Sequence, residues 1–280
     1  MGKLLSANFS RLFHSKVYWL GMFFMFGFAL FAVCARFHDT ITMPDYPYAT
    51  VDGLWFVGGI YLSVVLAVFI SIWIGTEYSD KTMRNKIIVG HARGAIYCSN
   101  WITCMIASLM MHLVYIAVIA GLGAVLLGRP ETPGKVLALS ILASLLTVMA
   151  LSSIFLLIAM LIDSKSTGVV VSMILALLII FGSMIVFNRL AAPEYYESSY
   201  EMVVDGQVIE GEPELNPRYL EGTKREVYQF VLDAVPGGQM LQYGDMSLPG
   251  NIARFPFYSS LIILLTSGFG WICFRRKDLK

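Results

Sequence analysis

Six long apolar segments dominate the pattern of hydrophobic and polar positions along this 280-residue chain. None of them contains a Lys, Arg, Asp or Glu, and an α-helix needs roughly 20 such residues to cross a bilayer. The segments lack the alternating polarity of a transmembrane β-barrel. The pattern therefore predicts an all-α polytopic membrane protein with six transmembrane helices. The predicted spans are residues 17–35, 54–76, 97–127, 136–162, 168–187 and 257–274.

Composition and charge agree with this prediction and give it a direction. The chain is 57% hydrophobic, 14% charged and has a mean hydropathy of +0.70, whereas soluble domains carry about 25% charged residues. If the N-terminus is cytosolic, the inside segments hold 12 of the 20 basic residues and only 4 of the 19 acidic residues. The positive-inside rule therefore predicts that both ends lie in the cytosol of a bacterial cell, with the chain in the cytoplasmic membrane.

The N-terminal residues 1–16 carry Leu5, Phe9, Leu12 and Phe13 at helical spacing beside basic residues. This predicts a short amphipathic helix in the cytosolic interface, with a frayed terminus as the alternative. The apolar run behind it is too long for a cleaved signal peptide, so we expect a retained first span. The other predicted units are residues 17–187 with helices one to five, 188–256 outside, and 257–280 with helix six and a basic tail.

The cytosolic segment 77–94 mixes apolar and basic residues between helices two and three. Ser79 or Asp80 can cap the start of a short helix, Gly90 can end it, and Met83 and Ile87 lie one turn apart. A solvated loop that satisfies the positive-inside rule is the alternative. A plain loop does not need apolar residues here, whereas a helix that inserts into a groove of a soluble partner does.

The order of these elements resembles the permeases of type-2 ABC exporters, the ABC-2 type family. The family usually has Gly-Thr after the glutamate at position 77, where this chain has Lys81-Thr82, and a basic residue such as Arg93 follows before the next span. Because Lys81 stands in the glycine position, a tight backbone turn there is less strongly predicted.

The resemblance implies that two permease subunits pair, as a homodimer or heterodimer, over two separate ATPase subunits. It makes Glu77 a polar hinge and the following helix a coupling helix. The chain has no P-loop sequence, so ATP and Mg belong to the partner. The residues expected at the ATPase-docking site are Glu77, Lys81, Thr82, Met83, Arg84, Lys86, Ile87 and Ile88.

The long outside region, residues 188–256, should contain folded structure. An Asp-Gly pair predicts a hairpin that sets Val203 opposite Val208. The sequence Thr223-Lys224-Arg225-Glu226 predicts a capping box before an amphipathic helix, which Val235-Pro236-Gly237-Gly238 should stop. The sequence Pro236-Gly237-Gly238-Gln239 resembles family sequences at the outer end of the pathway. The face expected at an outer gate, or else packed on helices five and six, is Val227, Phe230, Val231 and Ala234.

No sequence pattern indicates catalysis. The chain lacks nucleophile, metalloprotease and paired-carboxylate motifs, its four cysteines form no CxxC pair, and nothing indicates nucleic acid as a partner. We expect His112 to form a hydrogen bond to a neighbouring helix rather than bind a metal. No catalytic, cofactor or metal residue is therefore predicted. The family resemblance implies that helices two and five line the transport pathway. The residues that would line it are Tyr61, Phe69, Trp73, Met173, Phe181 and Met184. The alternative is that these side chains pack within the protein or face lipid.

The leading hypothesis is a non-catalytic permease subunit of an ATP-driven exporter that moves an amphipathic or apolar cargo outward by alternating access. Peptides, lipids and small drugs stay open as cargo. The alternative from another class is a non-transporting membrane scaffold or immunity protein, and an intramembrane enzyme is third. Substitution of charges within residues 83–88 separates the first two, since only a transporter would lose coupling to ATP hydrolysis.

Overall fold

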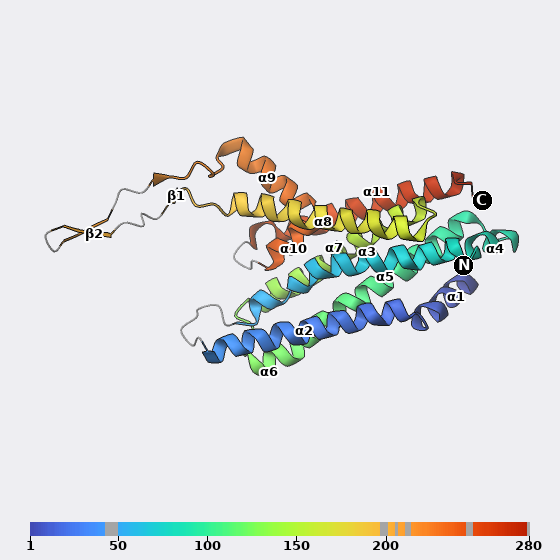
Figure 1. Cartoon of the computed structure of the whole chain (residues 1–280), viewed down its shortest axis with the longest axis horizontal. Coiled ribbons are helices and arrows are strands. Elements are labelled where there is room, and N and C mark those ends of the chain that lie inside the picture. The colour runs from blue at the N-terminus through green and yellow to red at the C-terminus, as the bar shows by residue number, and fades with distance from the viewer. Residues whose placement is uncertain (43–49, 197–200, 205–206, 211–213, 245–248, 279–280) are drawn as a thin grey trace.

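The computed structural model describes residues 1–42, 50–196, 201–204, 207–210, 214–244 and 249–278. Six of its helices are long and apolar enough to cross a membrane, which confirms the predicted number of spans. They run side by side along the long axis of the molecule (Figure 1). These helices are α2 (Lys16–Thr42), α3 (Val57–Ser79), α5 (Arg93–Val118), α7 (Gly134–Leu161), α8 (Lys165–Leu190) and α11 (Phe255–Arg276).

The helices extend beyond the predicted runs because polar residues at their ends continue the hydrogen-bonding pattern. The second predicted span also includes the 3₁₀ turn η1 (Asp52–Leu54), and the third continues through a π-helical turn, η2 (Ile119–Gly123), into α6 (Ala124–Leu126). A π-helical turn inserts one extra residue into an α-helix. The third span is therefore one continuous helical unit of 34 residues with a π-helical turn within it.

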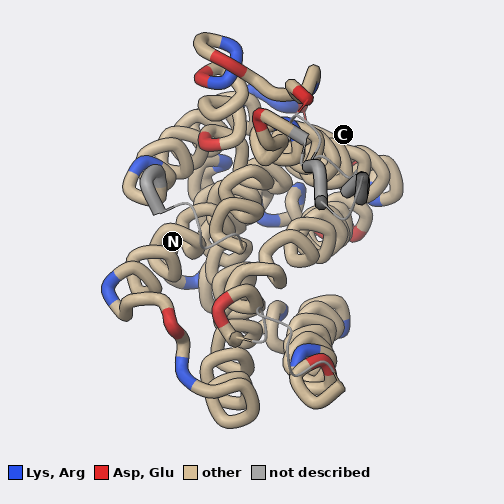
Figure 2. The backbone as a smooth tube through the Cα atoms, turned by 90° about the vertical axis from the view of Figure 1, so that its left-hand side faces the viewer, with Lys and Arg blue, Asp and Glu red and all other residues tan. Residues whose placement is uncertain are grey.

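The two ends of the bundle differ in what they carry. The chain ends, α1 (Gly2–Phe13) and α4 (Thr82–Ile88) lie at one end, and the strands extend from the other (Figure 1). Seen from the strand end, most of the chain is uncharged, and the charged positions form short patches at helix ends and connections (Figure 2). Both termini therefore share one end, as six spans require.

Helix α3 is central and packs against α2, α5, α7 and α8. Buried hydroxyl groups tie these helices together: Ser71 donates to Ser172 at 2.8 Å, and Ser108 donates to Ser152 at 3.0 Å. Hydrogen bonds of this kind are a common means of helix association in lipid. In contrast, α2, α8 and α11 leave most of their apolar surface uncovered, so they face lipid or a partner.

The region predicted to lie outside, residues 188–256, holds two antiparallel strand pairs and two helices among its described residues; we call it the outer region. Strand β1 (Tyr195–Tyr196) pairs with β4 (Glu214–Leu215), and β2 (Glu201–Val204) pairs with β3 (Gln207–Glu210). Val203 lies opposite Val208, which confirms the predicted hairpin register; its Asp205-Gly206 turn falls outside the described residues. The rest of this region comprises α9 (Gly222–Ala234), α10 (Pro236–Gly244) and the 3₁₀ turn η3 (Pro249–Arg254).

Candidate ATPase-docking site

Helix α4 begins with an unusual backbone conformation at Lys81. This residue has φ +55° and ψ +18°, the left-handed conformation, and no other described non-glycine residue has a positive φ. The tight turn therefore exists despite the lysine in the glycine position. The predicted caps Ser79 and Asp80 are wrong, because Lys81 itself is the N-cap and makes no side-chain capping bond. The Thr82 hydroxyl instead donates to the Glu77 carbonyl oxygen at 3.1 Å.

Helix α4 ends at Gly90 as predicted. This glycine has φ +96°, its N–H donates to the Ile87 carbonyl at 2.9 Å, and the next N–H, of His91, donates to the Lys86 carbonyl at 3.0 Å. This pair of bonds is the Schellman motif, which requires the left-handed conformation that glycine adopts at little cost. The short helix therefore has a fixed start and a fixed end.

The predicted docking residues divide between two faces of α4. Met83 is buried, Ile87 packs partly against the core, and Glu77 is fully buried, so these residues hold the helix to its own chain. Met83 and Glu77, two of the residues predicted to dock the ATPase, are thus buried within their own chain. Thr82 and Lys86 are half-buried, and Lys81 is exposed at the start of the helix. The free face consists of Arg84, Ile88 and two residues that the prediction omitted, Asn85 and Val89.

The buried carboxylate of Glu77 is the centre of an ionic cluster. Its Oε1 accepts from Arg11 Nη1 of α1 and from Lys86 Nζ of α4, each at 2.5 Å, and its Oε2 accepts from Asn100 Nδ2 of α5 at 2.9 Å. A carboxylate this deeply buried is tolerated only with paired charges and hydrogen bonds. The end of α3 is thus joined to three other helices through one side chain.

Asn8 completes this cluster from the buried face of α1. Its Nδ2 donates to Asn100 Oδ1 at 2.9 Å, and its Oδ1 accepts from Lys86 Nζ at 3.3 Å. Asn8 lies between Leu4 and Leu12, which are also buried, so α1 packs against α5 rather than only lying on the membrane. The sequence analysis missed this buried face because the residue at its centre, Asn8, is polar and separates two leucines four positions away on either side. We call Asn8, Arg11, Glu77, Lys86 and Asn100 the Glu77 cluster.

A second set of contacts closes the same end of the bundle. Lys277 Nζ, in the chain that follows α11, donates to the carbonyl oxygens of Met160 and Leu161 at 2.8 and 3.0 Å and pairs with Asp163 at 2.5 Å. A cation at a helix C-terminus satisfies carbonyls that have no partner within the helix. Lys277 also lies over the ring of Tyr78, the neighbour of Glu77 in α3.

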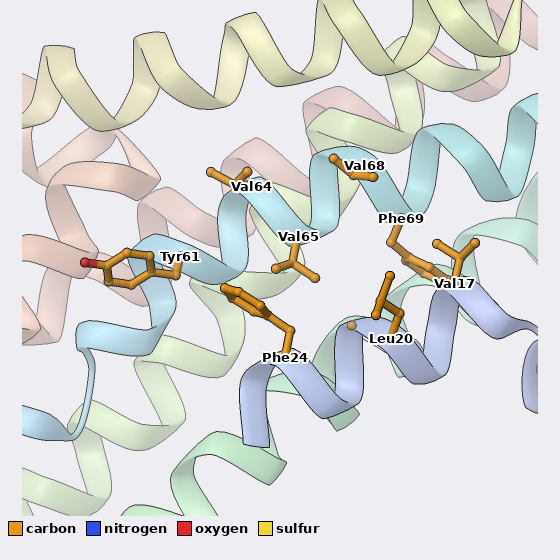
Figure 3. A pocket seen from close by; sticks show the side chains of 9 residues that line it. Val17, Leu20, Phe24, Tyr61, Val64, Val65, Val68 and Phe69 are labelled. Atoms are coloured by element: carbon orange, nitrogen blue, oxygen red, sulfur yellow. The ribbon is translucent and has the colours of Figure 1, made fainter. Parts of the chain in front are cut away.

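The predicted pathway residues fall into two groups. Tyr61 and Phe69 of α3 line an apolar groove of about 320 Å³ that faces α2 (Figure 3). Trp73 follows on the same helix, and the Arg11 guanidinium lies 3.6 Å from the centre of its ring. Phe69 and Trp73 are nearly buried within the chain. Met173, Phe181 and Met184 lie instead on α8, where Phe181 and Met184 are exposed.

At the outer end, the predicted gate face of α9 is not packed. Val227, Phe230 and Val231 are exposed, and the buried residues of this helix are Leu232 and Asp233. Packing of the predicted face on α8 and α11 is therefore wrong for most of its residues, although Phe230 touches Tyr258 edge to face. The predicted capping box is also wrong, because Glu221 is the N-cap and Thr223 lies inside the helix.

Helix α10 is the buried element of the outer region, and the sequence prediction missed it. Gln239 accepts from Thr147 of α7 at 2.7 Å and from Ser259 of α11 at 2.8 Å. Tyr243 Oη lies 3.2 Å from the Thr147 hydroxyl. These four uncharged side chains are buried, and we call them the Gln239 cluster. They join α10 to α7 and α11 by hydrogen bonds.

Two glycines explain why α10 can pack so closely. A Cβ atom on Gly238 would lie 2.2 Å from the Leu232 carbonyl oxygen, and one on Gly237 would lie 2.9 Å from the Ile179 carbonyl oxygen of α8. The Pro-Gly-Gly sequence does end α9, at Ala234, but the same residues begin α10, with Pro236 at its first position. The glycines mark close packing rather than a simple stop.

Several polar residues within the spans form interhelical hydrogen bonds. His112 Nε2 lies 3.0 Å from the Ser144 hydroxyl of α7, which confirms the bond predicted for this histidine. Among the residues that the structure describes, no three His, Cys, Asp or Glu side chains lie close enough together to hold a metal ion. The described cysteines are all free.

Comparison with known proteins adds one finding. Residues 4–183 match the family model described as ABC-2 family transporter protein. This part of the chain includes α1, α4 and the whole Glu77 cluster. No curated protein and no solved structure matches the chain significantly. Since the match covers well over half of the sequence, the chain belongs to the ABC-2 transporter family and is one of its multi-pass membrane proteins.

Proposed function

We propose that this protein is the transmembrane permease subunit of an ATP-driven exporter in the bacterial cytoplasmic membrane. It pairs with a second permease subunit and carries two ATPase subunits on its cytosolic face. The end with α1, α4 and both termini is the cytosolic end. Alternating access of the paired subunits moves an amphipathic or apolar cargo outward, and ATP and Mg bind to the ATPase.

The observation that carries this proposal is the division of α4 into a fixed face and a free face. Met83 is buried and Lys86 is bound to Glu77, so this side of the helix cannot move without α3. On the free side, the side chains of Ile88 and Val89 are 71% and 77% exposed. An exposed apolar pair beside basic residues is typical of a helix that fits a groove in a soluble partner.

The Glu77 cluster gives this docking helix a mechanical connection. The carboxylate at the end of α3 binds α1, α4 and α5 at once, so a force on α4 acts on three other helices through short ionic contacts. Coupling between distant sites requires such a physically connected set of contacts. If the ATPase displaced α4, helices α1, α3 and α5 would therefore move together with it.

The exposed faces of α2, α8 and α11 support pairing with a second subunit and passage of an apolar or amphipathic cargo. These helices bury less than a third of their apolar windows within the chain. Between the helix ends, their exposed side chains are apolar, as contact with lipid or with another protein requires, so they say little about the cargo. Peptide, lipid and small-molecule cargo all fit this lining.

Substitution of Ile88 by glutamate tests the docking role. Together with its ATPase, the natural chain is expected to yield a complex that survives membrane extraction. Ile88→Glu should remove the ATPase from that complex, because truncated or charged hot-spot residues cost about 2 kcal/mol or more, roughly a 30-fold loss of affinity.

Leu215→Glu in β4 is the matched control, since Leu215 is also an exposed apolar residue but lies at the opposite end. It should leave ATPase recovery unchanged. A natural chain that recovers no ATPase even after mild crosslinking would support the non-transporting alternative. Equal recovery with both variants would place the docking surface elsewhere.

A further inference from the structure

Two neighbouring cavities lie beside α2 and α3 and share lining residues. The apolar cavity of Figure 3 shares two lining residues, Val17 and Phe69, with a second cavity of about 280 Å³ that lies nearer the cytosolic end. The first cavity is lined entirely by apolar residues. The second adds polar and basic ones. We call the whole space the α2–α3 groove and the second cavity its mouth.

The mouth contains hydrogen-bond donors with no acceptor. Nε and Nη2 of Arg11 and Nε1 of Trp73 are buried and have no hydrogen-bond partner among the described residues. Trp73 is 5% exposed. Buried donors are nearly always paired in folded proteins, so three such atoms beside one cavity indicate a missing acceptor. Ser15 and Thr76 add two hydroxyl groups to the same lining.

The mouth is also positively charged. The basic residues Arg11 and Lys165 line it together with His14, and no acidic residue is part of this lining. Arg11 shares the single carboxylate of Glu77 with Lys86, so these two cations exceed their one counter-ion. An anionic group with several acceptor oxygens fits both the charge and the unpaired donors.

The length of the groove indicates what is attached to that anion. From Tyr61 to Thr76, α3 rises about 22 Å, which is more than one leaflet's share of a roughly 30 Å hydrocarbon core. We propose that the α2–α3 groove binds an anionic phospholipid from the leaflet on the side of the termini. The phosphate occupies the mouth, and an acyl chain lies along Val17, Leu20, Phe24, Val65, Val68 and Phe69.

A helix from a second copy of the chain fits this groove less well. Most spans carry a basic residue at the end where the mouth lies: Lys16 on α2, Arg93 on α5, Lys165 on α8 and Arg275 on α11. Such an end would place a cation beside Arg11 and Lys165. The apolar part accepts either occupant, but the charge of the mouth favours the lipid.

Native mass spectrometry of the full chain in detergent tests this proposal with added phosphatidylglycerol and, as the zwitterionic comparison, phosphatidylcholine. The bound fraction should reach half saturation at a lower concentration of phosphatidylglycerol than of phosphatidylcholine. Lys165→Gln should weaken phosphatidylglycerol binding about fivefold, because a basic residue near an anionic lipid surface contributes about 1 kcal/mol.

Lys16→Gln is the matched control, since it removes the same charge at the same end but does not line the mouth. It should leave binding unchanged. Val68→Trp, which fills the groove, should weaken phosphatidylglycerol binding, whereas Val170→Trp on the exposed face of α8 should not. The assay needs no ATPase, so its failure is separate from failure of the proposed function.

Three results would overturn the proposal. One is equal affinity for the two lipids, and another is an equal effect of Lys165→Gln and Lys16→Gln. The third is a disulfide-linked dimer of Val68→Cys that forms in the membrane and excludes phosphatidylglycerol, which would assign the groove to a second copy of the chain.

Discussion

Replacement of Glu77 by glutamine removes one charge from the centre of the Glu77 cluster with little change of shape. The amide oxygen could still accept from Arg11 and Lys86, but it carries no negative charge, and the NH₂ group in the place of Oε2 would face the Asn100 Nδ2 donor. Asn100 would also lose its ionised acceptor. The variant therefore leaves two cations without their shared counter-ion at the point where four helices meet.

The expected cost follows from the burial of the three charges. Removal of one member of a buried ion pair costs about 3–5 kcal/mol, because the remaining charge stays desolvated. Here the Glu77 side chain is fully buried, but those of Lys86 and Arg11 are 17% and 33% exposed, so both cations regain some water. We expect the lower end of the range, about 3 kcal/mol, which is roughly 6–12 °C in apparent melting temperature.

Asp163→Asn is the matched control for this measurement. Asp163 also pairs with a lysine at 2.5 Å, but its side chain is 64% exposed. Exposed pairs contribute about 0–1 kcal/mol, so this variant should melt within about 3 °C of the natural chain. Thermal unfolding of both purified variants in the same detergent compares a buried carboxylate with an exposed one, each 2.5 Å from a lysine Nζ in the natural chain.

The combined variant Glu77→Gln with Lys86→Met should recover part of the loss, because the second substitution removes a cation left without its partner. In the reconstituted transporter, Glu77→Gln should also reduce ATP hydrolysis that depends on the permease. Equal melting temperatures for Glu77→Gln and Asp163→Asn would refute the reasoning, since burial would then not decide the contribution of the pair.

Three further substitutions test particular backbone and side-chain environments by thermal unfolding. Lys81→Gly should stabilise the chain by about 0.5–1 kcal/mol. The left-handed conformation costs a non-glycine residue about 1–2 kcal/mol, and the greater backbone freedom of glycine in the unfolded chain offsets part of this gain. Gly238→Ala should destabilise by about 1–3 kcal/mol through its clash with the Leu232 carbonyl, whereas Gly182→Ala, with open space around it, should not. Burial raises the pKa of Asp233 despite hydrogen bonds from glutamine side chains, so the folded state holds this proton more tightly than the unfolded state. The free energy of unfolding should therefore fall as the pH rises above about 4, the pKa of the unfolded chain. Asp233→Asn should remove that pH dependence.

The spans were predictable because the bilayer imposes one simple rule on the sequence. A charge within a span costs several kcal/mol, so uncharged runs such as residues 168–187 identify the helices directly. Local rules also predicted the β2–β3 register from its Asp-Gly turn and the end of α4 from Gly90. Each of these features depends on residues that lie within about ten positions of one another.

The Glu77 cluster was not predictable in the same way. Arg11 and Asn100 lie 66 and 23 positions from Glu77, and nothing in the local pattern relates them. The available signals were Asn8 within the apolar face of α1 and Asn100 within an apolar span, since buried amides need partners. Helix α10 was missed for the opposite reason: Gly237 and Gly238 follow the local rule for a helix stop, and close packing overrides it.

The two polar clusters use different chemistry at the two ends of the bundle. The Glu77 cluster is ionic, and breaking a buried ion pair costs about 3–5 kcal/mol, so α3, α4 and α5 stay together as one unit. The Gln239 cluster contains only neutral hydrogen bonds, each worth about 0.5–1.5 kcal/mol net. Alternating access needs a rigid connection where the ATPase acts and a closure that can be broken and remade where cargo leaves. The ionic cluster suits the first requirement, and the neutral contacts around α10 suit the second.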